Sequence, residues 1–432
     1  MRTDAGSLPD TAVTARRGRK LNADRWPGAK MRVLIAHNFY RLSGGEDVAV
    51  LNEIEMLKRN GHDVSLISAH NDDIKGISKT ITTAMGTIHN IRSERQVAER
   101  IREFEPSLLH VHNFFPQFSP SIFGAARKAN VPSIMTLHNY RTLCPTGVLY
   151  HNGQTTERSL HSSAWWTVRE RAYRGSLLGS FVTAAMVEWH KRRRTWQTQV
   201  DQFVALTPFA KRKFVEAELP PDRIAIKPNW ANGPSCAVLT SSSVRHGALY
   251  VGRLSEEKGV RTLIEAWRFM DYPLRVAGDG PLRAWLTEQR VSNVSYLGRL
   301  NSDQVQAEML RASFLVMPSV CYEMFPVTLA EAFGCALPVI ASRLGSLATL
   351  VEHRSTGLHF EAADSVGLRD QVIWAIGHPQ GMRKLGNTAR ATFESHYTQE
   401  ANYAALMEIY DRTLKTSRNR RLSAASASAD GG

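Results

Sequence analysis

The sequence predicts an α/β protein built from two parallel sheets, each covered by helices on both faces. Short apolar runs alternate with helical stretches along most of the 432 residues, and this alternation is typical of parallel sheets whose consecutive strands are joined by helices. The alternation is interrupted once, at residues 229–246, which are rich in Asn, Gly, Pro and Ser. We interpret that segment as a linker between two domains of ordinary size.

The first domain is predicted over residues 31–228. Its opening run MRVLIAHNF is predicted as a strand, and the Gly-rich loop RLSGGED follows. The next stretch, DVAVLNEIEMLKRNG, has apolar residues at helical spacing and ends at Gly61. Further strands are predicted at HDVSLISAH, PSLLHVHNF, VPSIMTLH, VDQFVALT and RIAIKPN.

The second domain is predicted over residues 247–398. Its strands are the runs ALYVGRL, LRVAGDG, VSYLG, SFLVMPS, PVIAS and GLHF, again with helical stretches between them. A helix over 399–414 is expected to pack back on the first domain. The Ser-, Ala- and Arg-rich end, 415–432, is predicted to be a disordered tail, and residues 1–30 a flexible basic tail.

Composition and charge exclude several classes of protein. A hydrophobic content of 43% with 8% aromatic residues describes a globular protein. Of the net charge of +14, residues 1–30 contribute +4, residues 158–196 +6 and residues 415–432 +3, so the remaining chain is nearly neutral. A nucleic-acid enzyme more often spreads basic charge over its folded surface, so no nucleic-acid partner is expected. The four cysteines are scattered without a C-x-x-C pair, which favours a reduced, cytoplasmic protein.

Two carboxylates stand out in the segment CYEMFPVTLAEAFGCALPVI. Glu323 lies in a Pro-containing bend after the predicted strand SFLVMPS, and Glu331 lies eight residues later in a short predicted helix. A new strand follows. In a parallel sheet this strand-to-helix loop is at the carboxyl edge, where ligands bind.

Two glycine-containing loops of the second domain are candidates for binding anions. In YVGRLSEEKG, Arg253 and Lys258 lie on a loop before a helix expected to begin near Gly259, so side-chain charge and helix dipole both favour an anion. Solvated loop cations are the alternative interpretation. In VAGDGPLRAWL, Gly278 follows a strand, but Arg283 occupies the third Gly position of a dinucleotide loop, and no acidic residue closes a following strand. A nicotinamide-dinucleotide site is therefore not predicted.

Taken together, the motifs GRLSEEKG, GDGP and EMFPVTLAEAFG, in this order, resemble those of the retaining glycosyltransferases of the GT-B fold, specifically the large bacterial family 4. In the first domain RLSGGED resembles the Gly-Gly loop of that family, and TLHNYRTLCPTG resembles a His-containing loop of its polysaccharide-assembling members. The resemblance covers roughly residues 31–414. It implies two doubly wound Rossmann-like domains that face each other across a cleft, the first binding the acceptor and the second the nucleotide sugar.

The same resemblance implies the reaction and the residues that carry it. A sugar would move from a UDP- or GDP-linked donor to a saccharide or polyprenyl-diphosphate-linked acceptor, in the synthesis of bacterial cell-surface polysaccharide. The implied catalytic residues are His138, Arg253, Lys258 and Glu323. The implied donor-binding residues are Gly44, Gly45, Arg253, Lys258, Gly278, Glu323, Met324, Phe325, Val327, Thr328 and Glu331. The implied acceptor-binding residues are Glu46, His110, His112, Asn139 and Arg141.

No metal and no other cofactor is expected. The other major glycosyltransferase fold holds its metal with an Asp-x-Asp pair, and the chain contains no such pair. His110 and His112 alternate along a predicted strand and so share one face, but the sequence suggests no third metal ligand. Two other classes stay open: a nucleotide-sugar-binding protein without transferase activity, and a GT-B epimerase or phosphorylase.

Residues 158–196 form a basic segment with two interpretations. Leu178, Phe181 and Trp189 fall at helical spacing, and Lys191–Arg194 is a four-residue basic run. Tryptophan and arginine beside an apolar helix face describe an interfacial membrane helix, which would place the protein on the cytoplasmic face of the inner membrane. The alternative is a core helix with a solvated basic end. Met324 and Pro326 stand where many family members have Gly, which bears on donor preference.

Overall fold

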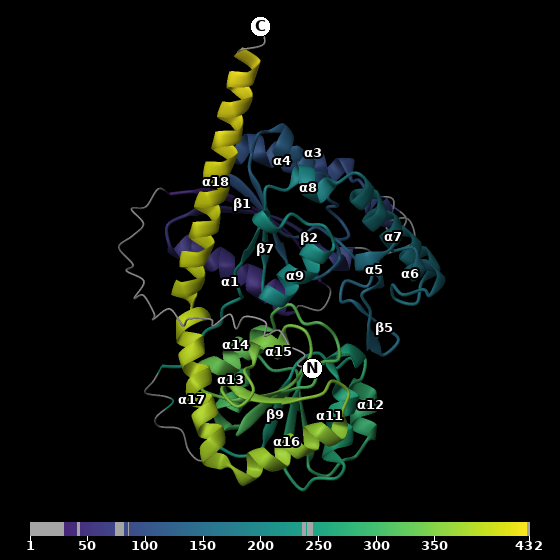
Figure 1. Cartoon of the computed structure of the whole chain (residues 1–432), viewed down its shortest axis with the longest axis vertical. Helices are drawn as coiled ribbons and strands as arrows, with labels where there is room; N and C mark the ends of the chain where they lie inside the picture. The colour runs from purple at the N-terminus through teal and green to yellow at the C-terminus, as the bar shows by residue number, and fades with distance from the viewer. Residues whose placement is uncertain are drawn as a thin grey trace, which may run out of the picture. The chain divides into compact units, whose positions relative to one another are not determined.

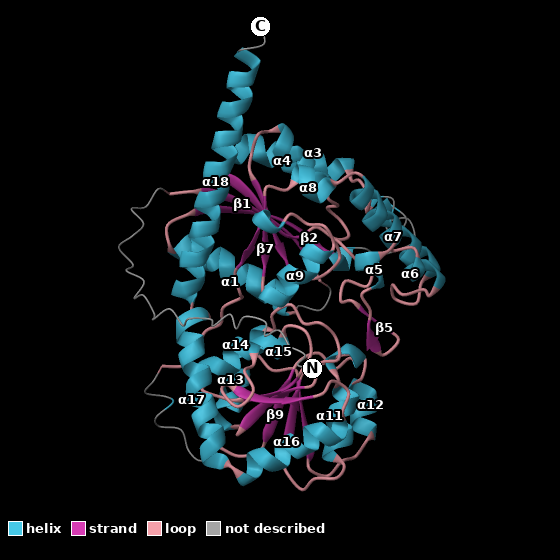
Figure 2. Ribbon diagram, in the orientation of Figure 1, coloured by secondary structure: helices cyan, strands magenta, loops and turns pink. Residues whose placement is uncertain are grey.

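The computed structural model describes residues 30–40, 44–73, 82–84, 86–235, 239 and 245–429. Within them lie two six-stranded sheets in which every pairing is parallel, with helices on both faces of each (Figures 1 and 2). The predicted fold class is therefore confirmed. The predicted tail at 1–29 lies outside the described residues, as does most of the predicted linker beyond residue 235.

The first sheet has the order β2-β1-β3-β4-β7-β8. All six strands lie where apolar runs predict them, and β3 and β4 are buried along their whole length, because helices cover both faces. The strands are β1 (Arg32–Phe39), β2 (Asp63–His70), β3 (Leu108–Asn113), β4 (Ser133–Leu137), β7 (Gln202–Ala205) and β8 (Ile224–Ile226).

The rest of this half consists of one hairpin and of helices, most of them short. One two-stranded hairpin, β5 (Tyr150–His151) with β6 (Gln154–Thr155), was not predicted, because two-residue strands carry no periodic signal. The helices are α1 (Gly45–Arg59), η2 (Asn71–Asp73), α3 (Ile91–Phe104), α4 (Ser121–Lys128), α5 (Arg158–His161), α6 (Trp166–Arg169), α7 (Leu177–Arg192), α8 (Thr195–Gln199), α9 (Pro208–Glu216) and η3 (Pro221–Arg223).

The second sheet has the order β11-β10-β9-β12-β13-β14. Its strands are β9 (Ala248–Val251), β10 (Leu274–Ala277), β11 (Val294–Gly298), β12 (Phe314–Met317), β13 (Val339–Ser342) and β14 (Gly357–Phe360). Its helices are η4 (Glu256–Lys258), α11 (Val260–Trp267), α12 (Arg283–Glu288), α13 (Ser302–Arg311), α14 (Val327–Gly334), α15 (Leu347–Leu350), α16 (Ser365–Gly377) and α17 (Pro379–His396).

The last helix, α18 (Gln399–Ala429), is longer than predicted (Figure 1). Its first part contacts the first half of the chain: Asn402 accepts a hydrogen bond from Lys227 at 3.0 Å, and Tyr410 bonds to His110 at 2.8 Å. The prediction of disorder from residue 415 onward is corrected, because the helix continues to Ala429. The composition explains the error, since Ser lowers hydrophobicity while Ala, Arg and Leu favour helix and neither Gly nor Pro interrupts before the end.

Candidate active site

The strand orders define where each sheet can hold a ligand. Along the second sheet the strand numbers decrease from β11 to β9 and increase from β12 to β14, so the strand order reverses between β9 and β12. In the first sheet it reverses between β1 and β3. Loops leave the carboxyl ends of neighbouring strands in opposite directions at such a switch point, so a crevice opens there. Arg253 and Lys258 follow β9, Glu323 follows β12, and the Gly44–Gly45 loop follows β1. The predicted site residues thus lie at both switch points.

Lys258 and Glu323 form the centre of the second switch point. The Lys258 ammonium lies 2.6 Å and 2.8 Å from the two carboxylate oxygens of Glu323, and Ser319 donates a hydrogen bond to the same carboxylate at 2.6 Å. Glu323 is buried, and Lys258 keeps 29% of its side chain exposed. Burial alone would lower the pKa of Lys258, but the Glu323 carboxylate outweighs it and raises that pKa to about 12. Lys258 therefore stays a cation with one N–H donor left for a ligand.

Ser319, whose hydrogen bond helps to hold the Glu323 carboxylate, was not among the predicted site residues, because a serine after a strand has no distinguishing pattern in the sequence. Arg253 lies on the same loop as Lys258 but is exposed, and among the described residues its side chain has no ion-pair partner.

Two glycines hold the loops of the second sheet together. Gly259 has φ +70°, and a Cβ on it would come within 1.8 Å of the Pro318 carbonyl oxygen. Gly278 has φ +143°, and a Cβ there would come within 1.8 Å of the Gly252 carbonyl oxygen. Both positions need glycine for close approach of the two loops. Gly278, predicted as a donor-binding residue, thus has a packing role that accounts for its glycine.

Glu331 and its neighbours lie around helix α14, which begins at Val327 after Pro326. Glu331 is partly buried, and burial raises the pKa of its carboxyl group. The side chains of Met324 and Phe325 are buried, with Phe325 packed edge-on against Tyr397. Met324 and Phe325 could therefore contact a nucleotide-sugar donor chiefly through their backbone atoms. Thr328 lies in the first turn of α14, where unpaired backbone N–H groups favour an anion.

The Gly44–Gly45 loop comes close to this helix. A Cβ built on Gly45 would lie 3.8 Å from Val327, and one built on Gly44 would meet no atom of the described residues within 4 Å. Gly44 has an extended backbone, which any residue adopts. Neither a positive φ nor a close contact with a described atom therefore requires glycine at these two positions.

Glu46, the next residue, has an unusual environment. Its Oε2 accepts hydrogen bonds from the Tyr40 hydroxyl at 2.9 Å and from Asn139 at 3.4 Å, while its Oε1 is buried with no hydrogen-bond partner among the described residues. Burial raises the pKa of Glu46 to about 8, against the lowering effect of the two hydrogen bonds. Arg141, also predicted to contact acceptor, packs its guanidinium over Phe115 at 4.7 Å and bonds to the Pro145 carbonyl. The structure thus brings Glu46 and Asn139 together, and holds Arg141 in the same loop as Asn139.

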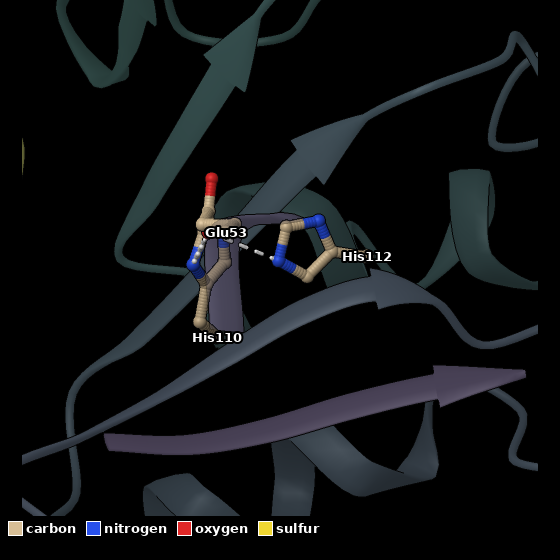
Figure 3. Close-up of side chains that lie close together, drawn as sticks. All are labelled: Glu53, His110 and His112. Carbon is tan, nitrogen blue, oxygen red and sulfur yellow. Dashed lines mark ion pairs between the residues drawn. The ribbon is translucent and has the colours of Figure 1, made fainter. Parts of the chain in front are cut away.

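His110 and His112 require a correction. They were predicted to contact acceptor, but His110 is fully buried, with Nδ1 bonded to Tyr410 and Nε2 to Thr136, both at 2.8 Å. His112 is also buried, and its Nδ1 lies 3.0 Å from Nε2 of His138. Alternation along the strand put both rings on the face covered by α1 and α18, which sequence could not identify. Sequence analysis did not identify Glu53 of α1 as a third member of this group. Figure 3 shows its carboxylate in contact with both rings.

Helix α7 exposes much of its apolar surface. Leu178, Phe181 and Trp189 are 65%, 51% and 47% exposed, and Arg193 packs over the Trp189 ring. Trp196, the last residue of the basic segment 158–196, is buried against Phe114 and does not extend this surface. Among the described helices, none is long and apolar enough to cross a membrane.

Comparison with known proteins identifies relatives of both halves. Residues 43–232 match the family described as Glycosyltransferase Family 4, and residues 245–378 match Glycosyl transferases group 1. An uncharacterized glycosyltransferase of Methanocaldococcus jannaschii is 24% identical over 88% of this chain and 98% of its own. The D-rhamnosyltransferase WbpZ of Pseudomonas aeruginosa is 31% identical over 35% of this chain and 41% of its own.

Solved structures share the fold. A glycosyltransferase from Rickettsia africae superposes with a TM-score of 0.64 at 17% identity, covering 89% of this chain and 99% of its own. The Anabaena protein HepE, solved with UDP-glucose, superposes with a TM-score of 0.61 at 14% identity, covering 88% and 100%. At these identities the likeness concerns the fold alone.

Proposed function

The chain belongs to the family 4 glycosyltransferases of the GT-B fold, and we propose that it transfers a sugar, with retention of anomeric configuration, from a nucleotide-diphosphate donor. The observation that carries this proposal is the Lys258–Glu323 pair at the switch point of the second sheet. A cation and a carboxylate fixed side by side suit the two ends of one ligand. The cation meets a diphosphate, and the carboxylate accepts hydrogen bonds from sugar hydroxyls. The HepE structures, one with UDP and another with UDP-glucose, support a nucleotide-sugar donor.

Four polar side chains share three roles in this proposal. Arg253 and Lys258 bind the diphosphate, Glu323 orients the transferred sugar, and Glu331 accepts hydrogen bonds from the ribose hydroxyls. As the bond from the anomeric carbon to the phosphate oxygen breaks, its electron pair goes to the leaving diphosphate. Lys258 and Arg253 stabilise that developing charge, so the reaction is expected to proceed without a divalent metal.

Retention follows from attack on the face that the nucleotide leaves. The acceptor hydroxyl oxygen bonds to the anomeric carbon, and its proton passes to the departing phosphate oxygen on the same side. We infer that the acceptor is a saccharide or lipid-linked saccharide bound by the first domain, near Glu46 and Asn139, with His138 beside the donor sugar. The pathway we favour is bacterial cell-surface polysaccharide synthesis.

A peripheral membrane location is part of the proposal. The exposed apolar face of α7, defined as Leu178, Phe181 and Trp189, adjoins the exposed basic run 191–194. An apolar face edged with cations fits an anionic lipid surface on the cytoplasmic side, where a polyprenyl-linked acceptor would lie. Neutralising the four basic residues is expected to weaken vesicle binding.

The test begins with a panel of UDP- and GDP-linked sugars screened by thermal shift. A donor at 100 times its Kd should stabilise the folded protein by about 2.7 kcal/mol. The stabilising donor is then incubated with saccharide acceptors, and the anomeric configuration of the product is read by NMR. An inverted product, or activity that EDTA abolishes and Mn²⁺ restores, would overturn the mechanism. Donor binding without transfer or hydrolysis would favour a binding protein instead.

A further inference from the structure

A buried polar cluster lies beneath His138, which follows β4 directly. Its members are Glu53 from α1, His110 and His112 from β3, and Lys227. Glu53 Oε1 lies 3.1 Å from Nδ1 of His110 and 3.2 Å from Nε2 of His112 (Figure 3). Its other oxygen accepts a hydrogen bond from the Lys227 ammonium at 2.9 Å. All four side chains are less than 10% exposed.

The charge state of this cluster follows from its contacts. Burial would raise the pKa of Glu53, but the Lys227 ammonium beside it outweighs burial and holds that pKa well below its usual range, so Glu53 is a carboxylate. Burial, with His110 adding to it, lowers the pKa of His112 to about 3, so His112 is neutral at physiological pH. Burial and His112 lower the pKa of His138 as well. A neutral imidazole carries one N–H and one lone pair, and its neighbours decide which nitrogen has which.

Those neighbours fix the proton positions one after another. In the part of the chain that the structure describes, His112 Nε2 has no hydrogen-bond partner and faces Glu53 Oε1 at 3.2 Å, where a lone pair on the nitrogen would be repelled by the carboxylate oxygen. The proton of His112 therefore lies on Nε2, although the contact is not an aligned hydrogen bond. Its Nδ1 is then a lone pair, and it accepts a hydrogen bond from Nε2 of His138 at 3.0 Å. His138 accordingly keeps its proton on Nε2.

We propose that Glu53 is a positioning residue which, acting through His112, holds His138 in the tautomer that leaves Nδ1 as a hydrogen-bond acceptor. Among the described residues Nδ1 of His138 has no hydrogen-bond partner, and the residue is only partly buried. This inference rests on the proposed function, in which His138 lies beside the donor sugar. There the lone pair on Nδ1 would accept a hydrogen bond from a hydroxyl of the substrate, whereas the other tautomer would present a donor.

A metal site is the other use that this cluster invites, because one carboxylate and two imidazoles lie within 4.8 Å of one another. The charges disfavour it. Lys227 already balances the single negative charge of Glu53, so a divalent cation would leave two uncompensated positive charges in the interior. Burying unpaired charge is strongly unfavourable. The tautomer proposal needs no added charge.

The direct test is long-range ¹H–¹⁵N correlation NMR on protein labelled with ¹⁵N-histidine, because a protonated ring nitrogen and an unprotonated one resonate far apart. The His138 signals are assigned by their loss in His138→Gln. In the wild-type protein we expect Nδ1 of His138 to be unprotonated and Nε2 protonated. The opposite pattern, or an average between the two tautomers, would overturn the proposal without any variant of Glu53.

Glu53→Gln tests the cause. Lys227 requires an oxygen at its contact, so the amide NH₂ would face His112, reverse both tautomers and put the His138 proton on Nδ1. With a donor and acceptor in hand, we expect kcat/KM to fall by about 10- to 100-fold, the range known for loss of a partner that orients a metal-binding histidine. Glu53→Asp keeps the charge and should keep the wild-type tautomer and kcat/KM within a few-fold. An unchanged tautomer in folded Glu53→Gln would also overturn the proposal.

Two further outcomes are separable. If no nucleotide sugar gives product with the wild-type protein, the proposed function fails, while the NMR result still decides the tautomer. If elemental analysis of the purified protein finds one equivalent of a divalent metal that Glu53→Gln loses, the cluster is a metal site and the tautomer proposal is wrong.

Discussion

Replacing Lys258 by alanine is the sharpest test of the donor site. The change removes the ammonium that lies 2.6 Å and 2.8 Å from the oxygens of Glu323. Glu323 stays buried and keeps its hydrogen bond from Ser319. The carboxylate thus loses its cation but not all of its partners, and we expect the free energy of unfolding to fall by about 1–3 kcal/mol.

The larger effect is expected on turnover. Without substrate, Lys258 is already paired with Glu323, so its attraction for the diphosphate of a bound donor is weakened. The donor Kd of Lys258→Ala should therefore rise by no more than about tenfold. In the transition state the diphosphate carries additional negative charge, and the loss of one such electrostatic contact typically costs about 10²–10³ in kcat. The signature is therefore a fall in kcat larger than the rise in Kd.

The assay combines initial rates of transfer with donor Kd from calorimetry, both at a temperature where the variant is folded. Lys258→Arg retains a cation and should recover part of kcat. Lys384→Ala removes an exposed lysine from α17 of the same half and should change neither quantity. Full turnover by folded Lys258→Ala would refute the assignment, as would a large rise in Kd with kcat intact.

Three further outcomes test other parts of the site. Glu331→Ala should weaken donor binding, seen in Kd by calorimetry, with kcat at saturation within a few-fold, because ribose hydroxyls do not change during the reaction. Because the pKa of Glu46 in the folded protein is raised to about 8, its stabilising contribution is complete below pH 4.5 and is lost as pH rises through 8. The melting temperature of Glu46→Gln relative to the wild type should therefore rise from pH 5 to 9, and a constant difference would contradict this. Anionic vesicles should sediment the protein less at high salt and less after Phe181→Ser with Trp189→Ser, whereas Phe269→Ser, at another exposed phenyl group, should have no effect.

Local pattern predicted most of the fold because its central strands, such as β3 and β4, are buried on both faces and read as continuous apolar runs. β12 and α14 lie where the segment around Glu323 and Glu331 predicts them. The signal failed where burial is not periodic. The hairpin β5–β6 is too short to show alternation, and the end of α18 has helix-favouring residues within a composition that resembles disorder.

By itself the sequence determined that Arg253, Lys258 and Glu323 lie on loops after strands and Glu331 on the helix that follows, because the position of a residue relative to an apolar run is a local property of the chain. Only the tertiary structure decided which groups touch. The ion pair between Lys258 and Glu323 joins residues 65 apart, and the contact between Tyr410 and His110 joins residues 300 apart. Glu53 illustrates the difference best: it is one of several acidic residues on an amphipathic helix until α1 packs against β3. In the folded protein Glu53 is a buried anion between two histidines. The sequence does not show this, because no sequence pattern determines which face of a strand a helix will cover.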